Sequence, residues 1–214
     1  MGDILFYLSC LLIGGSYILY FLFVLLGNKT KISNSNGFDL SKDMISEYNS
    51  INIIESTGKF TFYNIKRRVI KLSSKCYYGY DLISISLSLI ESGISIIDSK
   101  KNKYIDLFRK VFSNLKILYI FPILALLINN VTYMISDVKV SMLFIVIFTV
   151  ISYVLIDIKS NALDVISLGL EKNKDINKDN VNRIITFINR ILWLDKLMFF
   201  GELIIILRFV YIML

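Results

Sequence analysis

Few side chains in this sequence could take part in catalysis, and their types restrict the chemistry. The chain has no histidine, so it lacks the commonest general base near neutral pH and the commonest zinc ligand. Its two cysteines, Cys10 and Cys76, lie in very different surroundings, which excludes a disulfide framework or a cysteine-based metal cluster. No Gly-rich phosphate loop, GxSxG elbow or CxxC pair is present. The sequence therefore contains no familiar catalytic apparatus.

Positive charge is densest at Lys66, Arg67, Arg68 and Lys71, in a chain whose net charge is +7. Such a patch can bind nucleic acid, but basic residues also gather on the cytoplasmic face of membrane proteins. Insertion and anionic lipids both favour them there. We favour the second interpretation and expect no nucleic-acid partner.

The composition predicts an integral membrane protein. Hydrophobic residues make up 55% of the 214 residues and charged residues 19%, whereas a soluble domain has about a quarter charged. The apolar residues are concentrated in long uncharged runs, which excludes a purely soluble protein. Four segments have the length and apolarity of transmembrane helices. They are Ile4–Leu26, Ile117–Ile135, Val140–Ile156 and Leu197–Leu214.

The first segment reads as a retained anchor because its 23 uncharged residues are too many for a secretory signal and no small-residue cleavage site follows. The second and third are expected to form a hairpin, residues 117–156, joined by a turn at 136–139. The fourth contains Glu202 and Arg208, which should face protein or the interface because charge is costly in lipid.

Two polar regions, residues 27–116 and 157–196, are separated by an even number of predicted crossings and so face one compartment. Most basic residues near the span ends lie on that side, which the positive-inside rule identifies as the cytoplasm. These residues are Lys29, Lys31, Arg109, Lys110, Lys116, Lys159 and Arg190. The sequence therefore predicts a multi-pass cell-membrane protein with both termini outside and the lipid bilayer as its surroundings.

The larger polar region is predicted to be a small α+β unit. Ser41–Tyr48 reads as a short helix capped by Ser41. β-branched and aromatic runs predict a small sheet; they are Ile51–Glu55, Phe60–Tyr63 and Arg68–Leu72. Gly79–Asp98 is ambiguous: Ile and Ser alternate as in a strand, yet one helical stripe is also apolar. That stripe comprises Ile83, Leu87, Ile90, Ile94 and Ile97.

The order of these elements resembles the bacterial membrane zinc metallopeptidases of the YugP type. Ile70-Lys71-Leu72-Ser73 is similar to a strand of that family, and the step Tyr77-Tyr78-Gly79 follows it. Glu91 comes twelve residues after Gly79, where the glutamate of the family's HExxH motif would stand, and Gly93 follows. The resemblance implies four membrane helices, a cytoplasmic α+β region and an active-site helix at residues 80–98.

The zinc ligands of that family are not present here. In HExxH two histidines on one helical face hold Zn²⁺ while the glutamate activates the bound water. Both histidine positions are isoleucine, Ile90 and Ile94, and the third-ligand position falls at Leu155, two residues before Asp157. Hydrocarbon cannot donate a lone pair, so we expect no metal and no other cofactor, and a vestigial Glu91. The isoleucines would then fill the former metal cavity.

Three hypotheses follow. The first is a pseudopeptidase that acts by binding a peptide, an active paralogue or another membrane protein. The second is an unrelated small membrane protein with a structural or transport-accessory role. The third is an active peptidase with unconventional ligands. The sequence names neither the partner nor the oligomeric state.

Overall fold

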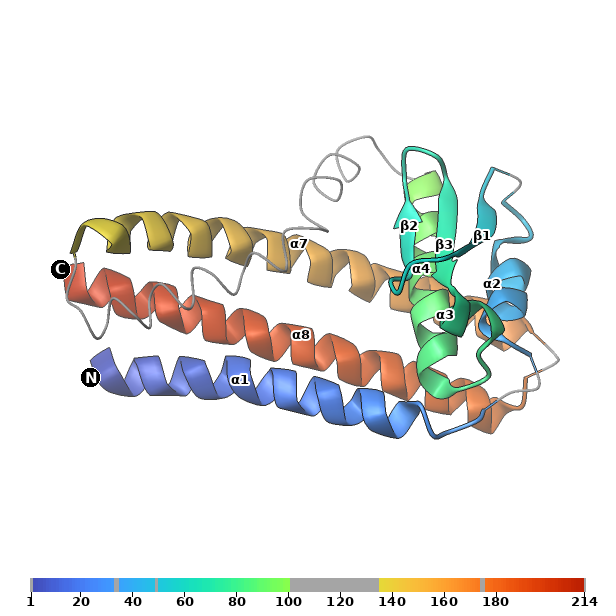
Figure 1. The fold of residues 1–214 in the computed structure, drawn as a ribbon, viewed down its shortest axis with the longest axis horizontal. Coiled ribbons are helices and arrows are strands. Elements are labelled where there is room, and N and C mark those ends of the chain that lie inside the picture. The colour runs from blue at the N-terminus through green and yellow to red at the C-terminus, as the bar shows by residue number, and fades with distance from the viewer. Residues whose placement is uncertain (1, 33–34, 49, 101–134, 174–175, 214) are drawn as a thin grey trace. The chain divides into compact units, whose positions relative to one another are not determined.

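The computed structural model describes residues 2–32, 35–48, 50–100, 135–173 and 176–213. It is mostly helical, with one small sheet, as predicted (Figure 1). Its helices are α1 (Gly2–Gly27), α2 (Gly37–Ile45), α3 (Ser74–Tyr78), α4 (Leu82–Lys100), α7 (Ile135–Lys172) and α8 (Lys178–Met213). Its strands are β1 (Asn52–Ser56), β2 (Phe62–Asn64) and β3 (Val69–Ser73). The predicted span Ile117–Ile135 lies, except for its last residue, outside the described residues.

The described chain divides into two compact units. The first unit holds residues 2–18, 135–156 and 194–213, and the second holds residues 19–100 and 157–193 apart from the gaps given above. The three long helices α1, α7 and α8 each contribute to both units.

Among the described residues, two helical segments are long and apolar enough to cross a membrane: Ile4–Gly27 in α1 and Leu82–Ser99 in α4. They differ in burial. Within the 18-residue window that defines each segment, 17% of the first is buried and 67% of the second. The α4 segment is therefore a core helix of the second unit, whereas α1 leaves most of its apolar surface uncovered.

The first unit buries polar groups and exposes apolar ones. Ser9, Ser16, Thr149 and Glu202 are all buried there. Its exposed large side chains include Ile4, Tyr7, Leu8, Leu11, Tyr17, Ile18, Val146, Ile147, Val150, Tyr153, Phe200 and Leu207. In water this arrangement would leave a large apolar surface exposed, whereas it suits a surface in contact with lipid.

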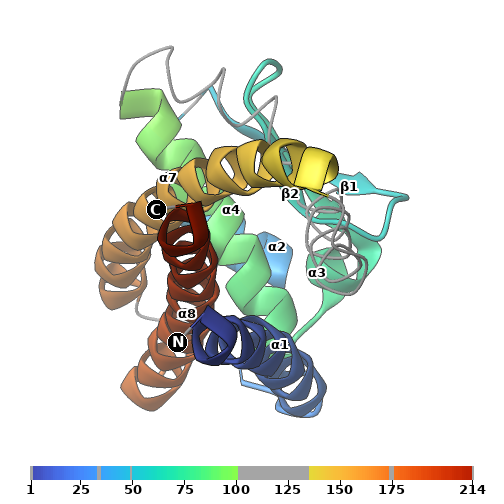
Figure 2. The same cartoon turned by 90° about the vertical axis from the view of Figure 1, so that its left-hand side faces the viewer.

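Small residues let α1 and α8 approach closely inside the first unit, where the two helices lie side by side (Figure 2). A Cβ atom on Gly201 would lie 2.6 Å from Cγ1 of Ile13 and 3.3 Å from the carbonyl oxygen of Ser9. Beside it, Glu202 is only 1% exposed and accepts a hydrogen bond from Oγ of Ser152 at 3.2 Å. The prediction that Glu202 faces protein is confirmed.

The sheet of the second unit has the strand order β1-β3-β2, with β1 parallel and β2 antiparallel to β3. The three predicted strands are confirmed to within one or two residues. Ile70 and Leu72 point to the same face of β3, because side chains alternate along a strand, and both are fully buried. Tyr63 is paired with Ile70 across the ladder and is also buried.

Helix α4 is the core of the second unit, and the ambiguous segment Gly79–Asp98 is resolved as helix. Each residue from Leu82 to Ser99 is buried or half-buried. The predicted stripe of isoleucines and Leu87 is therefore only part of the covered surface, which also includes fully buried Ile85, Leu89 and Ile96. A helix covered on all sides needs no polar face, so its sequence lacks a clear helical period.

Two serines of α4, Ser84 and Ser88, lie where neighbouring backbone comes close. The hydroxyl of Ser88 donates to the carbonyl oxygens of Ser84, at 2.8 Å, and Cys76 in α3, at 3.3 Å. A Cβ atom on Gly37, at the start of α2, would lie 2.6 Å from the same hydroxyl oxygen. Serine is small and satisfies its hydroxyl on its own helix, so it can be buried at such a contact. This packing explains the alternation of Ile and Ser that resembles a strand.

Two local predictions are wrong. The short helix begins at Gly37 rather than Ser41, because Asn36 caps it by accepting the N–H of Asp39 at 2.8 Å. The turn predicted at residues 136–139 lies inside the first turns of α7, which starts at Ile135. No glycine or proline interrupts that stretch, and Asp137 is compatible with the positive end of a helix dipole.

Replacement of Gly37 by alanine tests this packing. The added methyl would lie 2.2 Å from the carbonyl oxygen of Cys76, so backbone must move. We expect Gly37→Ala to lower the free energy of unfolding by about 1–3 kcal/mol. The measurement is the thermal unfolding midpoint of the purified full chain. Gly58→Ala is the control, because its methyl would meet only Oγ of Ser56, at 3.4 Å. Equal midpoints for the two variants would contradict the packing described for α2 and α4.

Candidate functional site

Glu91, the residue expected to be the vestige of a catalytic glutamate, lies in the middle of α4 and is half-buried. Its Oε2 atom accepts a hydrogen bond of 2.7 Å from the backbone N–H of Tyr63. Tyr63 belongs to β2, an edge strand of the sheet. The carboxylate therefore holds the sheet against α4.

A second carboxylate of α4 binds the same tyrosine. The hydroxyl of Tyr63 donates to Oδ2 of Asp98 at 3.0 Å. Glu91 and Asp98 are seven residues apart, which places them on one face of the helix. The two acids thus anchor the backbone and the side chain of one strand residue. This arrangement accounts structurally for a carboxylate pair that could otherwise suggest acid–base catalysis.

The positions expected for zinc ligands do not fit the metal. Ile90 is 7% exposed and Ile94 4% exposed, and neither side chain has a donor atom. Leu155 is half-buried in α7 and belongs to the first unit, whereas Ile90, Glu91 and Ile94 belong to the second. Among the described residues, no group of three or more His, Cys, Asp or Glu could hold a metal ion. Of the four positions expected at a zinc site, Ile90, Glu91, Ile94 and Leu155, only Glu91 has a side-chain oxygen that could bind a metal.

Gly93, which follows Glu91 in the expected motif, lies at the contact between α4 and α7. A Cβ atom on Gly93 would lie 3.0 Å from the carbonyl oxygen of Ala162. Ala162 and Ile166 are fully buried at this crossing. Ala162 and Ile166 therefore occupy the space next to Gly93.

Tyr78, from the Tyr-Tyr-Gly step, is tied to the sheet by Glu55. Its hydroxyl donates to Oε2 of Glu55 at 2.9 Å, while Oγ of Ser74 donates to Oε1 at 2.7 Å. The hydrogen bond to the carboxylate, together with its negative charge, raises the pKa of Tyr78 above its ordinary value. Tyr78 is therefore a protonated structural tie near neutral pH and an unsuitable base.

The basic patch is spread over a turn and a strand. Lys66, Arg67 and Arg68 are exposed between β2 and β3. Lys71 lies within β3, with its ammonium 5.6 Å from the ring centre of Phe62. These residues form no enclosed site with one another, and the prediction that they bind no nucleic acid stays a prediction.

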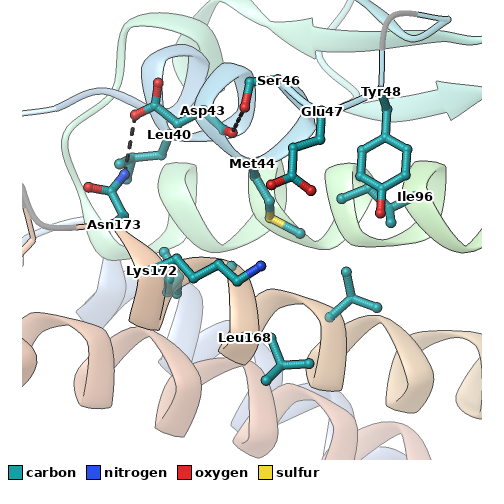
Figure 3. A pocket seen from close by; sticks show the side chains of 13 residues that line it. Leu40, Asp43, Met44, Ser46, Glu47, Tyr48, Ile96, Leu168, Lys172 and Asn173 are labelled. Carbon is teal, nitrogen blue, oxygen red and sulfur yellow. Dashed lines mark hydrogen bonds between the residues drawn. The ribbon is translucent and has the colours of Figure 1, made fainter.

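A cavity of about 520 Å³ in the second unit was not anticipated from the sequence (Figure 3). It lies between α2 with the residues after it, α4, and the end of α7. Its lining is Leu40, Asp43, Met44, Ser46, Glu47, Tyr48, Ile96, Val165, Leu168, Gly169, Leu170, Lys172 and Asn173. Nδ2 of Asn173 donates to Oδ2 of Asp43 at 3.2 Å, which connects two of its walls.

This cavity has apolar side chains such as Ile96 and Leu168 together with a few charged ones, the composition of many small-ligand sites. The charged side chains, Asp43, Glu47 and Lys172, are all exposed. Its residues come from segments more than a hundred positions apart in the sequence, so no local motif could have revealed it. Its lining offers both polar and apolar contacts and selects no class of ligand.

Comparisons with protein-family models, with curated proteins and with solved structures found no match. The functional proposal therefore rests on the geometry of the chain itself.

The role of Glu91 can be separated from catalysis by two substitutions. Glu91→Ala leaves the N–H of Tyr63 without its acceptor, and we expect a loss of about 1–3 kcal/mol in the free energy of unfolding. Glu91→Gln retains an acceptor oxygen and should lose less. The measurement is chemical or thermal unfolding of the full chain. Glu171→Ala, on an exposed position of α7, serves as the control. If Glu91→Ala is as stable as this control, the tie to β2 contributes nothing.

Proposed function

We propose that this chain is an integral, multi-pass membrane protein that acts by binding rather than by catalysis. Its second unit would be a non-catalytic relative of the YugP-type zinc metallopeptidases, facing the cytoplasm. The observation that carries the loss of catalysis is the state of Glu91. Its carboxylate accepts the N–H of Tyr63, and the residues on either side at the expected ligand positions are buried isoleucines.

Membrane insertion is supported by the first unit. Polar side chains such as Ser9 and Glu202 are buried there, while large apolar side chains of α1, α7 and α8 are exposed. Helices α7 and α8 carry charged residues in their second-unit parts, for example Asp157 and Lys159 in α7 and Arg183 in α8, whereas α1 stays apolar up to its end at Gly27. The predicted topology of four crossings, with both termini outside, then requires the second and third crossings to be joined before α7 begins at Ile135.

The peptidase resemblance is supported by the order of local elements. A short helix, a small sheet and the Tyr-Tyr-Gly step precede α4, and Glu91 lies near the centre of that helix. Ile90 and Ile94 are four residues apart and buried. Replacing two buried ligands by hydrocarbon removes the cost of burying polar groups that have no metal to bind. A protein altered in this way keeps the fold and can retain only its binding role.

Topology can be tested by cysteine labelling. In a background of Cys10→Ser and Cys76→Ala, a single cysteine is introduced as Asp3→Cys or as Lys66→Cys. We expect a membrane-impermeant maleimide to label the first in intact cells and the second only after permeabilisation. The reverse labelling pattern would show that the orientation in the membrane is opposite to the proposed one. Labelling of both in intact cells would contradict the assignment of the two positions to opposite sides.

Metal content tests the loss of catalysis. We expect elemental mass spectrometry of the purified full chain to find zinc far below one atom per chain, because the ligand positions are hydrocarbon. The Glu91→Gln variant should give the same value. Near-stoichiometric zinc that is lost in Glu91→Gln would overturn the proposal and indicate an active peptidase with unconventional ligands.

A further inference from the structure

A second hollow of the second unit, of about 320 Å³, is basic. It lies between the beginning of α8 and the residues that follow α1. Its lining is Thr30, Leu82, Asn182, Arg183, Thr186, Phe187 and Arg190. Two of these residues are arginines and none is a carboxylate. Neither guanidinium makes an ion pair with a described residue.

Three of the four polar lining residues of α8 share one face of the helix. Arg183, Thr186 and Arg190 are separated by three and then four residues, and all three are exposed. With a rise of 1.5 Å per residue, the two arginines leave the helix about 10 Å apart. Both nonetheless border the same hollow, with the hydroxyl of Thr186 between them.

The hollow adjoins the end of α1, the helix with the length and apolarity to cross a membrane. The guanidinium carbon of Arg190 lies 6.0 Å from the ring centre of Phe23 in α1. Thr30 follows the end of α1 by three residues, and its own hydroxyl already donates to the carbonyl oxygen of Leu26 at 3.1 Å. Arg183, Arg190 and Thr186, together with the amide of Asn182, are thus the side-chain donors that remain for a ligand.

An exposed tryptophan continues this face of α8. Trp193 comes three residues after Arg190 and is 64% exposed, and it is the single tryptophan of the chain. Tryptophan is enriched where a membrane helix passes the lipid headgroups. Further along α8, Lys196 is also exposed, and beyond it the exposed large side chains are the apolar Phe200 and Leu207. The exposed side chains of the helix therefore change from basic and aromatic to hydrocarbon.

We propose that this hollow binds the phosphate of an anionic phospholipid headgroup on the cytoplasmic side. Guanidinium groups are suited to phosphate because their N–H donors match its oxygens in pairs. Arg183 and Arg190 would bind the phosphate oxygens, and Thr186 would donate a further hydrogen bond. The inference rests on the membrane insertion proposed above, since that places the hollow at the depth of the headgroups.

The test uses the purified full chain in nanodiscs of phosphatidylcholine with or without phosphatidylglycerol. Native mass spectrometry measures which lipid stays bound. We expect selective retention of phosphatidylglycerol, with its apparent affinity lowered about fivefold by either Arg183→Gln or Arg190→Gln and about 25-fold by both. The matched control is Lys66→Gln with Arg67→Gln, which removes the same charge from an exposed turn. This control should retain the lipid as the wild type does.

Three results would overturn the inference. The first is undiminished selectivity in the double arginine variant, and the second is an equal loss in the control. The third is displacement of phosphatidylglycerol by millimolar inorganic phosphate, which would identify free phosphate as the ligand. Alkaline carbonate extraction of native membranes tests the underlying proposal separately. A chain that is extracted is not integral, whereas a chain that resists extraction but shows no lipid selectivity refutes the headgroup site alone.

Discussion

The all-round burial of α4 is the constraint on which the second unit depends. Six elements of that unit contact it: α2 at Gly37, α3 at Cys76, β2 at Tyr63, α7 at Ala162, and the ends of α1 and α8 through Ile83, Gly27 and Phe187. Such a helix cannot vary freely in side-chain size, because each face meets a different neighbour at a fixed distance. Glycine and serine stand where backbone approaches, and isoleucine fills the remaining space. The helix is as apolar as a membrane span for this reason alone.

The helices α1, α7 and α8 run through both units, and polar side chains are buried in each unit. In the second unit the described buried polar residues are serines, five of them in α4. In the first unit they are Ser9, Ser16, Thr149 and Glu202, and aromatic and aliphatic side chains are exposed there. Glu202 and Ser152 join α7 to α8 by a hydrogen bond, a type of contact that holds helices together where the hydrophobic effect between them is absent.

Sequence reasoning succeeded where the signal was local. The β-branched runs predicted all three strands, and the cost of a charge in lipid predicted the burial of Glu202. It failed at Asn36 because capping residues occur at neighbouring positions, and at residues 136–139 because polar residues there are compatible with a turn although no glycine or proline interrupts that stretch of the helix. The partner of Glu91 could not be predicted at all: the N–H of Tyr63 is 28 residues away, and a backbone donor leaves no trace in a side-chain pattern. The cavities could not be predicted either, because their lining residues come from segments that are distant in the sequence.

The hydrogen bond between Glu91 and Tyr63 also affects how the sheet can grow. An edge strand offers unpaired N–H and C=O groups, and an extended peptide can add to them as a further strand. At Tyr63 the N–H is already taken by a side chain of the protein itself. Strand addition at this point of β2 would have to displace a charge-assisted hydrogen bond before it gained a neutral one. The hydrogen bond from the N–H of Tyr63 to the Glu91 carboxylate thus disfavours both the addition of a peptide strand and edge-to-edge association at this point of β2.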